Sequence, residues 1–209
     1  MNRWLAAGVA VIFLAGPAMA DNAWKVDPNN SAVQFTVRHL GISNVEGDFT
    51  KISGTVNLDD SDISKSSVTA SVDMSSVDTR VTMRDNDLKS EKFFDVAQFP
   101  TMTFQSTKIW STGQGTEKMA GNLTLHGVTK EVVFDVTGPT PTINQNGLMR
   151  RGAEATATID RRDFGITADP GIVGDDVSIT LDIEMTQQGS GGAPAPGSRG
   201  MQSSAASQQ

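Results

Sequence analysis

The sequence lacks cysteine and tyrosine, and it has only two histidines, His39 and His126. Without cysteine there can be no disulfide, no thiolate metal site and no thiol nucleophile. The two histidines are far apart in the sequence, and neither lies beside a nucleophile signature or in the close spacing of a zinc site. Because each ends an expected strand near a glycine, we expect loop positions whose rings hydrogen-bond to the backbone. We therefore expect no catalytic residue, no metal and no cofactor.

Basic residues are also scarce, since 17 lysines and arginines stand against 24 acidic residues and the net charge is −7. A chain with this excess of negative charge is not attracted as a whole to nucleic acid or to an anionic lipid surface. We expect no nucleic-acid partner, although a local basic cluster remains compatible with this charge.

Long apolar runs are absent except for Leu5 to Leu14, which is too short for a comfortable membrane span. Arg3 precedes this run and Ala18-Met19-Ala20 follows it, which is the pattern of a secretory signal peptide cut after Ala20. An uncleaved anchor is the alternative. No later segment is apolar enough to cross a membrane, so we expect a soluble chain exported to a bacterial periplasm.

The C-terminal stretch from Gln187 has almost no large apolar residue and consists mainly of Gly, Ser, Ala, Pro and Gln. Such a segment cannot bury enough surface to offset the entropy lost on ordering. The remaining chain is long enough for one hydrophobic core. We therefore predict a signal peptide at 1–20, one folded domain at 21–186 and a disordered tail at 187–209.

Within the predicted domain, eight segments alternate apolar and polar residues with period two, which is typical of strands with one buried face. A shift of this alternation near Thr50-Lys51 indicates a β-bulge. The spacing between segments suits hairpins and leaves no room for βαβ units, so the sheet should be antiparallel. The segments are Ser31–Arg38, Gly47–Leu58, Ser67–Ser75, Thr101–Trp110, Glu117–Leu125, Lys130–Thr137, Gly152–Ile159 and Asp176–Thr186.

Eight strands with one apolar face must stack as a sandwich or close into a barrel, and strands of this length favour closure because it removes exposed edges. The outward face is polar, which argues against a barrel embedded in an outer membrane. The inward face mixes bulky and small side chains, which favours either a ligand cavity or a filled core. These inward residues are Phe35, Phe104, Phe134, Ala70, Ala153, Ala155, Ala157 and Gly121.

The stretch from Arg80 to Phe104 interrupts the alternation. Thr82 and Asp85 have the spacing of a capping box, which predicts a short helix over Thr82–Ser90. The charged residues here suggest an ion-pair network that fixes the helix against a barrel end. The alternative is recognition of an anionic or polar headgroup, because arginine binds phosphate and carboxylate in bidentate fashion. These charged residues are Arg80, Arg84, Asp85, Asp87 and Lys89.

An ordered series of motifs between Trp24 and Met185 resembles the YceI-like proteins. The chain departs from the family pattern at Asp87, where the family often has histidine two residues after Arg-Asp. The matching segments are Trp24–Pro28, Ser31–Phe35, Arg38-His39 with Gly41, Val45–Phe49, Val77–Thr79, Arg84-Asp85, Leu88, Phe93–Asp95, Phe99-Pro100, Phe104, Gly121–Lys130 and Arg162–Gly165.

The resemblance implies an all-β, eight-stranded antiparallel, lipocalin-like barrel with a short helical crossover between its early and later strands. It also implies a periplasmic protein that binds a long isoprenoid or other lipid-like amphiphile without catalysis. A structural or stress-response interaction module with a filled barrel is the alternative. We predict that Arg80, Arg84 and Phe94 lie near the barrel mouth. The predicted cavity lining is Val33, Phe35, Val72, Phe104, Leu123, Phe134, Ala155 and Ile179.

Overall fold

The computed structural model describes residues 22–188, so the predicted signal peptide and nearly all of the predicted tail lie outside the described residues. The described chain is mostly strand, with one α-helix, α1 (Thr82–Lys89), and three short 3-10 helices. The 3-10 helices are η1 (Ile63–Lys65), η2 (Met74–Ser76) and η3 (Arg161–Phe164). The strands are β1 (Ala23–Val26), β2 (Ala32–His39), β3 (Ser43–Phe49), β4 (Ile52–Asn57), β5 (Ser67–Asp73), β6 (Val77–Asp78), β7 (Thr101–Gly113), β8 (Thr116–Leu125), β9 (Val128–Thr137), β10 (Ile143–Gln145), β11 (Leu148–Asp160) and β12 (Val173–Gln188).

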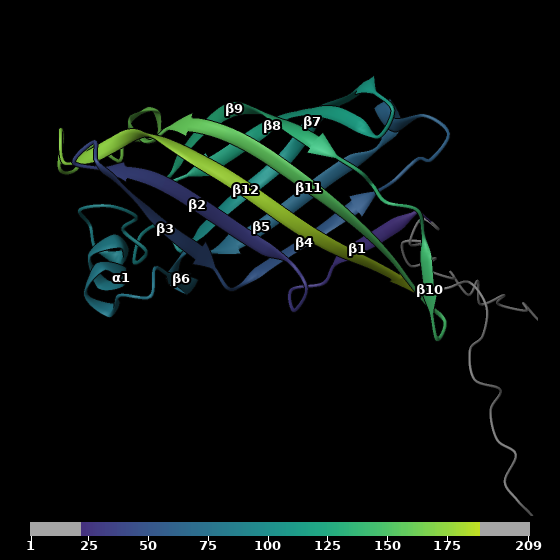
Figure 1. The fold of residues 1–209 in the computed structure, drawn as a ribbon, viewed down its shortest axis with the longest axis horizontal. Coiled ribbons are helices and arrows are strands. Elements are labelled where there is room, and N and C mark those ends of the chain that lie inside the picture. The colour runs from purple at the N-terminus through teal and green to yellow at the C-terminus, as the bar shows by residue number, and fades with distance from the viewer. Residues whose placement is uncertain (1–21, 189–209) are drawn as a thin grey trace, which may run out of the picture.

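Eight of these strands form a closed ring in the order β12-β1-β4-β5-β7-β8-β9-β11, with β11 pairing back onto β12. The pairings around the ring are antiparallel. Beyond β12, the strands β2, β3 and β6 extend the wall toward the end where α1 lies, whereas β10 lies at the opposite end (Figure 1). The predicted all-β, eight-stranded antiparallel barrel with a helical crossover is confirmed.

The second alternating segment, Gly47–Leu58, was expected to be one strand with a bulge at Thr50-Lys51 and instead divides there into β3 and β4. The break arises because Ser76 binds both residues, accepting the Thr50 N–H at its carbonyl (3.3 Å) and the Lys51 N–H at its hydroxyl (3.1 Å). Strand β3 continues the pairing with β2, while β4 pairs with β1 and β5.

The helix α1 begins at Thr82 as predicted, but the predicted capping box is wrong. The N-cap residue is Val81, which makes no side-chain capping bond. Arg80 has a positive φ of 64°, and the chain bends there. Thr79 consequently reaches the Asp85 carboxylate, which accepts hydrogen bonds from the Thr79 N–H (2.8 Å) and hydroxyl (2.5 Å). Asp85 therefore fastens the helix to the end of β6 instead of capping its first turn.

The segment after α1 closes the barrel end nearest the helix. Phe93 is buried in the main core cluster, and Phe94 packs against that cluster from its edge. The Phe94 ring centroid lies 5.9 Å from that of Phe49, which in turn lies 5.7 Å from that of Phe35. Aromatic contacts of this kind join the crossover segment to β2 and β3 and cover that end of the barrel.

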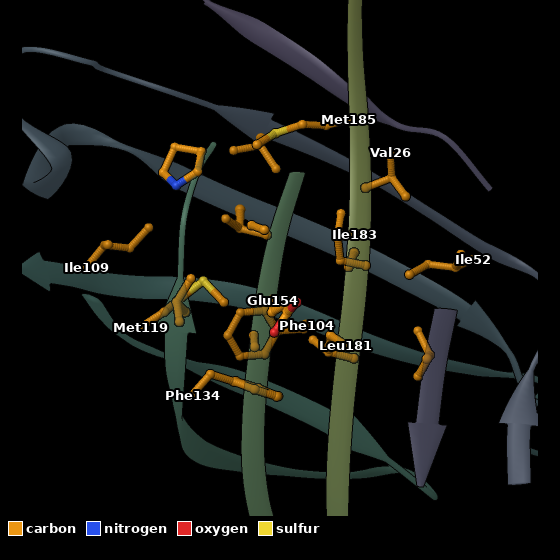
Figure 2. A pocket seen from close by; sticks show the side chains of 18 of the residues that line it. Val26, Ile52, Phe104, Ile109, Met119, Phe134, Glu154, Leu181, Ile183 and Met185 are labelled. Atoms are coloured by element: carbon orange, nitrogen blue, oxygen red, sulfur yellow. The ribbon is translucent and has the colours of Figure 1, made fainter. Parts of the chain in front are cut away.

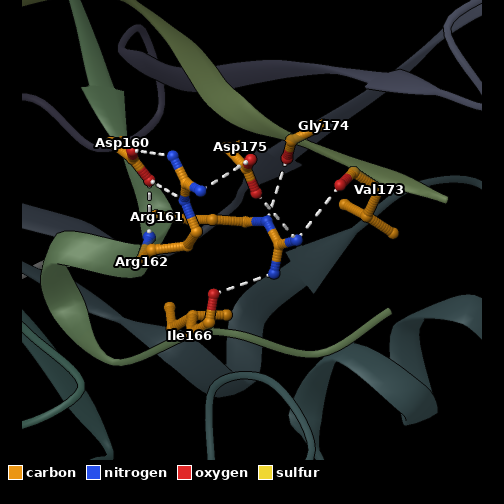
Figure 3. A network of polar contacts seen from close by, with 7 residues as sticks. All are labelled: Asp160, Arg161, Arg162, Ile166, Val173, Gly174 and Asp175. Carbon is orange, nitrogen blue, oxygen red and sulfur yellow. Dashed lines mark hydrogen bonds and ion pairs between the residues drawn. The ribbon is translucent and has the colours of Figure 1, made fainter. Parts of the chain in front are cut away.

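A buried arginine in η3 holds the loop before β12. Arg161 is only 4% exposed, and its guanidinium donates to the carbonyls of Ile166 (2.8 Å), Val173 (3.0 Å) and Gly174 (2.9 Å) (Figure 3). It also donates to the Asp175 carboxylate at 3.3 Å. A planar group with five donors suits such a fork of acceptors, which a single ammonium could not satisfy.

The neighbouring Asp160 predicts a change of stability with acid. Its carboxylate accepts from the Arg162 side chain (2.6 Å) and the Arg162 N–H (2.9 Å). These hydrogen bonds, led by the one from the Arg162 side chain, lower the pKa of Asp160 from 3.8 to about 2. A depressed folded pKa adds stability above the unfolded pKa, and that stability is lost as pH falls from near 4 toward 2.

Replacing Asp160 by Asn should therefore reduce the loss of stability over that pH interval, as measured by urea unfolding at a series of pH values. The matched control is Asp163→Asn, which changes an acidic residue inside the 3-10 helix η3 that Asp160 caps. If Asp160→Asn retained the full wild-type pH dependence between 4 and 2, the inferred contribution would be wrong.

Candidate functional site

The barrel encloses an apolar cavity of about 170 Å³ between its walls. Phe104, Met119 and Phe134 project from β7, β8 and β9, and Leu181 and Ile183 face them from β12 (Figure 2). The full lining is Val26, Val33, Ile52, Val56, Leu58, Ile63, Ser66, Val68, Ala70, Val72, Met102, Thr103, Phe104, Ile109, Glu117, Met119, Leu123, Phe134, Val136, Pro139, Ala153, Glu154, Ala155, Ile179, Leu181, Ile183 and Met185.

A second cavity of about 100 Å³ lies toward α1. It shares three wall residues with the first, namely Val33, Met102 and Ile179, so the two cavities adjoin within one lumen. Its remaining lining comes from β2, β3, η2, α1 and the segment after it, the ends of β8 and β11, η3, the loop before β12 and β12 itself. These residues are Gln34, Phe35, Val37, Phe49, Met74, Leu88, Phe93, Phe94, Leu125, Ile159, Arg161, Ile166, Val173 and Val177.

Gly121 on β8 sets the shape of the wall beside Phe104. A Cβ at this glycine would lie 2.6 Å from the Gln105 carbonyl oxygen and 2.6 Å from Phe104 Cε2. The Phe104 ring therefore packs closely against the glycine and meets the Phe134 ring edge-on, with centroids 5.3 Å apart. A larger residue at position 121 would force Phe104 into the lumen, so the space depends on this glycine.

The size of the lumen limits what it holds without rearrangement. An apolar protein cavity of about 150 Å³ accommodates one benzene molecule. By that comparison the first cavity has room for about one isoprene unit. A longer chain requires the two cavities to join, and Met102 stands on the wall of both. Methionine is flexible and adapts to irregular apolar shapes, which makes it the side chain best suited to such a movement.

Nine of the eleven predicted site residues lie on a cavity wall. Phe35 and Phe94 line the second cavity only, and Val33 and Ile179 line both. The other five line the first cavity: Val72, Phe104, Leu123, Phe134 and Ala155. That these residues contact a ligand stays a prediction.

The two predicted arginines line neither cavity. The Arg80 side chain is 81% exposed and has a long ion pair of 3.9 Å with Asp48. Arg84 points back at Thr79, donating to its hydroxyl (2.8 Å) and its carbonyl (2.7 Å). The geometry of Arg84 therefore fits the structural role considered for the charged residues of this segment, since its guanidinium holds the turn before α1.

Replacing Arg84 by alanine should lower the free energy of unfolding by about 1–2 kcal/mol, because two hydrogen bonds from a charged donor are lost and Thr79 is buried. Denaturant unfolding measures this change. The matched control is Lys89→Ala at the last turn of α1, which should cost less. Lost binding of an apolar ligand with unchanged stability would contradict this assignment.

Sequence reasoning missed four functional candidates on the cavity walls. Met102 and Met119 lie in the alternating segments Thr101–Trp110 and Glu117–Leu125 but were not among the predicted lining residues. Arg161 follows a strand without any periodic signal, and Glu117 lies at the first position of an expected strand, where the alternation is weakest. The alternation could have found Glu117, because it shares parity with Met119 and Leu123.

A family model described as the YceI-like domain matches residues 24–185. The chain belongs to the YceI-like family. Among YceI-like relatives, a UPF0312 protein of Yersinia pestis (strain Pestoides F) is 35% identical over 180 residues, which cover 85% of this chain and 93% of the relative.

Two solved structures show the same fold. The Campylobacter jejuni YCEI protein is 28% identical with a TM-score of 0.66, covering 72% of this chain and 90% of its own. A domain from Saccharophagus degradans, described as a polyisoprenoid binding domain, is 15% identical with a TM-score of 0.57, covering 78% of this chain and 97% of its own. The second likeness concerns the fold alone.

The departure from the YceI-like pattern at Asp87 falls in an ion-pair network. Asp87 lies 3.8 Å from Lys92 Nζ, and the same ammonium lies 2.8 Å from Asp169 in the loop before β12. The Asp169 side chain, as the nearest hydrogen-bond partner, raises the pKa of Lys92. Position 87 thus contacts another charged side chain on the outside of the closed end.

The two histidines have different environments. His126 adopts a positive φ of 51° in the β8–β9 turn, and its Nδ1 lies 3.2 Å from the Phe164 carbonyl oxygen, so the expected ring-to-backbone contact is confirmed there. The His39 ring makes no hydrogen bond to another described residue. Within residues 22–188 no cluster of histidines and carboxylates is arranged to hold a metal ion, and no helix is long and apolar enough to cross a membrane.

Proposed function

We propose that this YceI-like protein binds, without catalysis, the apolar part of an isoprenoid or other lipid-like amphiphile inside its barrel. The observation that carries this proposal is the lumen itself, which is walled almost entirely by aliphatic and aromatic side chains from every strand of the ring. Burial of an apolar chain there is favourable by about 25 cal/mol per Å² before the cost of association.

Family membership and fold support the same proposal. The Saccharophagus degradans domain with this fold is described as polyisoprenoid binding, and isoprenoid chains are among the ligands that an apolar barrel suits. We propose further that the protein acts in a periplasm, because the sequence around Arg3, Leu5–Leu14 and Ala18–Ala20 has the pattern of a cleaved export signal.

The small volume of the lumen favours a second candidate function. Cavities of about 170 and 100 Å³ lie below the roughly 300–1,000 Å³ of pockets for drug-sized ligands. A barrel that stays this full would act as a structural or interaction module without a lipid. The two functions differ in whether the barrel walls move apart to admit the apolar chain of a lipid.

Native mass spectrometry of the full protein, purified from its own cell envelope, separates the two functions. We expect a bound mass that lipid extraction recovers. Ala155→Phe should abolish that mass because Ala155 is buried on the cavity wall, whereas Thr156→Phe on the outer face of the same strand should retain it. A clean apo mass and no extractable lipid in the wild-type protein would favour the filled barrel.

A further inference from the structure

Glu117 is a partly buried acidic residue on the mostly apolar wall of the first cavity, at the inner side of β8. Glu154 also lines this cavity, but it lies at an exposed position of β11 (Figure 2). Glu117 lines the cavity together with Met119 and Leu123, which share its parity on the strand. Its neighbour Lys118 points outward and pairs with Asp135 at 2.6 Å. The alternation of the strand therefore turns the carboxyl group of Glu117 toward the lumen.

One oxygen atom of this carboxyl group lacks a hydrogen-bond partner. Its Oε2 atom is buried and has no partner among the described residues. Its Cα neighbours across the sheet are Ser111 on β7 and Val136 on β9, neither of which brings a charge. Buried polar atoms in proteins are almost always paired, and an exception at a cavity wall marks a place where a ligand group can bind. Burial also raises the pKa of Glu117, with no charged group opposing the shift.

Among the described residues that line the lumen, none offers a free cation. The lining of the first cavity includes no lysine or arginine, and the guanidinium of Arg161 in the second is already bonded to three carbonyls and Asp175. A phosphate or carboxylate headgroup inside the barrel would find no partner of opposite charge and would face the Glu117 carboxyl group. A hydroxyl or amine would instead supply the hydrogen that Oε2 lacks.

We infer that Glu117 recognises the polar end of the ligand, and that this end is a hydrogen-bond donor such as an alcohol or amine, not an anion. This inference rests on the proposed binding of an amphiphile. Glu117 lies near the start of β8, and Leu125 at the other end of that strand lines the second cavity. The apolar chain would then run from Glu117 along β8 toward α1, over roughly 27 Å at the rise of a strand.

The test compares three ligands with the same C20 isoprenoid chain: geranylgeraniol, the matching hydrocarbon without the hydroxyl, and geranylgeranyl phosphate. Each displaces the uncharged fluorescent probe N-phenyl-1-naphthylamine from the full chain. We expect the alcohol to bind roughly tenfold more tightly than the other two, as one buried hydrogen bond predicts. Glu117→Met should remove this preference and leave the affinity for the hydrocarbon unchanged.

Glu131→Met is the matched control, because Glu131 lies on the exposed face of β9 and should keep the preference for the alcohol. Denaturant unfolding of Glu117→Met should show no loss of stability, since the variant removes an unpaired buried oxygen. If wild type binds the hydrocarbon but shows no preference for the alcohol, or if Glu117→Met retains that preference, the role of Glu117 is overturned. If no ligand displaces the probe from wild type, the proposed function itself fails.

Discussion

Replacing Arg161 by alanine should lower the free energy of unfolding by about 3–5 kcal/mol, the range for breaking a buried, hydrogen-bonded charge interaction. Arg161 is 4% exposed and reaches three backbone carbonyls besides Asp175. Alanine would leave these acceptors buried without their donors, and each unpaired buried acceptor lowers the stability of the folded state. The loop between η3 and β12 would also lose the group that joins its two ends.

Urea unfolding of two further variants tests this interpretation. Arg161→Lys keeps the charge but replaces the planar fork by one ammonium, so it should be clearly less stable than wild type. Arg162→Ala is the neighbouring control, because that side chain is 55% exposed and its loss should cost much less stability than the loss of the buried Arg161. An Arg161→Ala protein within about 1 kcal/mol of wild type would show that water replaces the lost donors.

Replacing Phe134 by alanine should lower the free energy of unfolding by about 3–5 kcal/mol, the usual cost of removing a buried aromatic ring. Phe134 is 4% exposed and packs edge-to-face on Phe104 in the wall of the first cavity. The substitution should also enlarge the lumen. The truncated protein should therefore be less stable but should accept a bulkier apolar ligand than wild type.

Thermal or urea unfolding measures the loss of stability in Phe134→Ala. Val133→Ala is the control because Val133 is 41% exposed on the outer face of the same strand. Ligand displacement with linear and branched apolar molecules measures the gain in space. Equal losses of stability at positions 133 and 134 would contradict the inward assignment of Phe134. Loss of binding for ligands of all sizes would indicate collapse of the wall into the new space.

The residues of the inner barrel wall were predictable because the alternation of apolar and polar residues is a local feature of the sequence. A period of two fixes which side chains share a face, and closure of the sheet turns that face inward, so Val33, Phe104 and Phe134 could be placed on the inner wall from sequence alone. The short strands β1, β6 and β10 were missed because four, two and three residues cannot establish an alternation. They are strands only because longer neighbours supply partners.

Side-chain partners across the fold were not predictable in the same way. Arg84 contacts Thr79 because the chain bends at Arg80, and the capping-box spacing of Thr82 and Asp85 gave no sign of that bend. Arg161 depends on carbonyls from a loop whose path is set by tertiary contacts. Nothing in the sequence indicates that the carboxyl group of Glu117 remains unpaired, because that depends on which side chains surround the lumen.

The place of β12 in the ring has a consequence for how the protein folds. This strand pairs with β11 along one side and with β1 and β2 along the other, so Lys25 meets Thr186 across nearly the whole described chain. Contacts between such distant residues slow folding, because a long loop must close before they form. Until β12 is added, β1 and β11 remain open edges and the interior is accessible from the side. An amphiphile present at that stage could enter laterally, without passing through either end of the finished barrel.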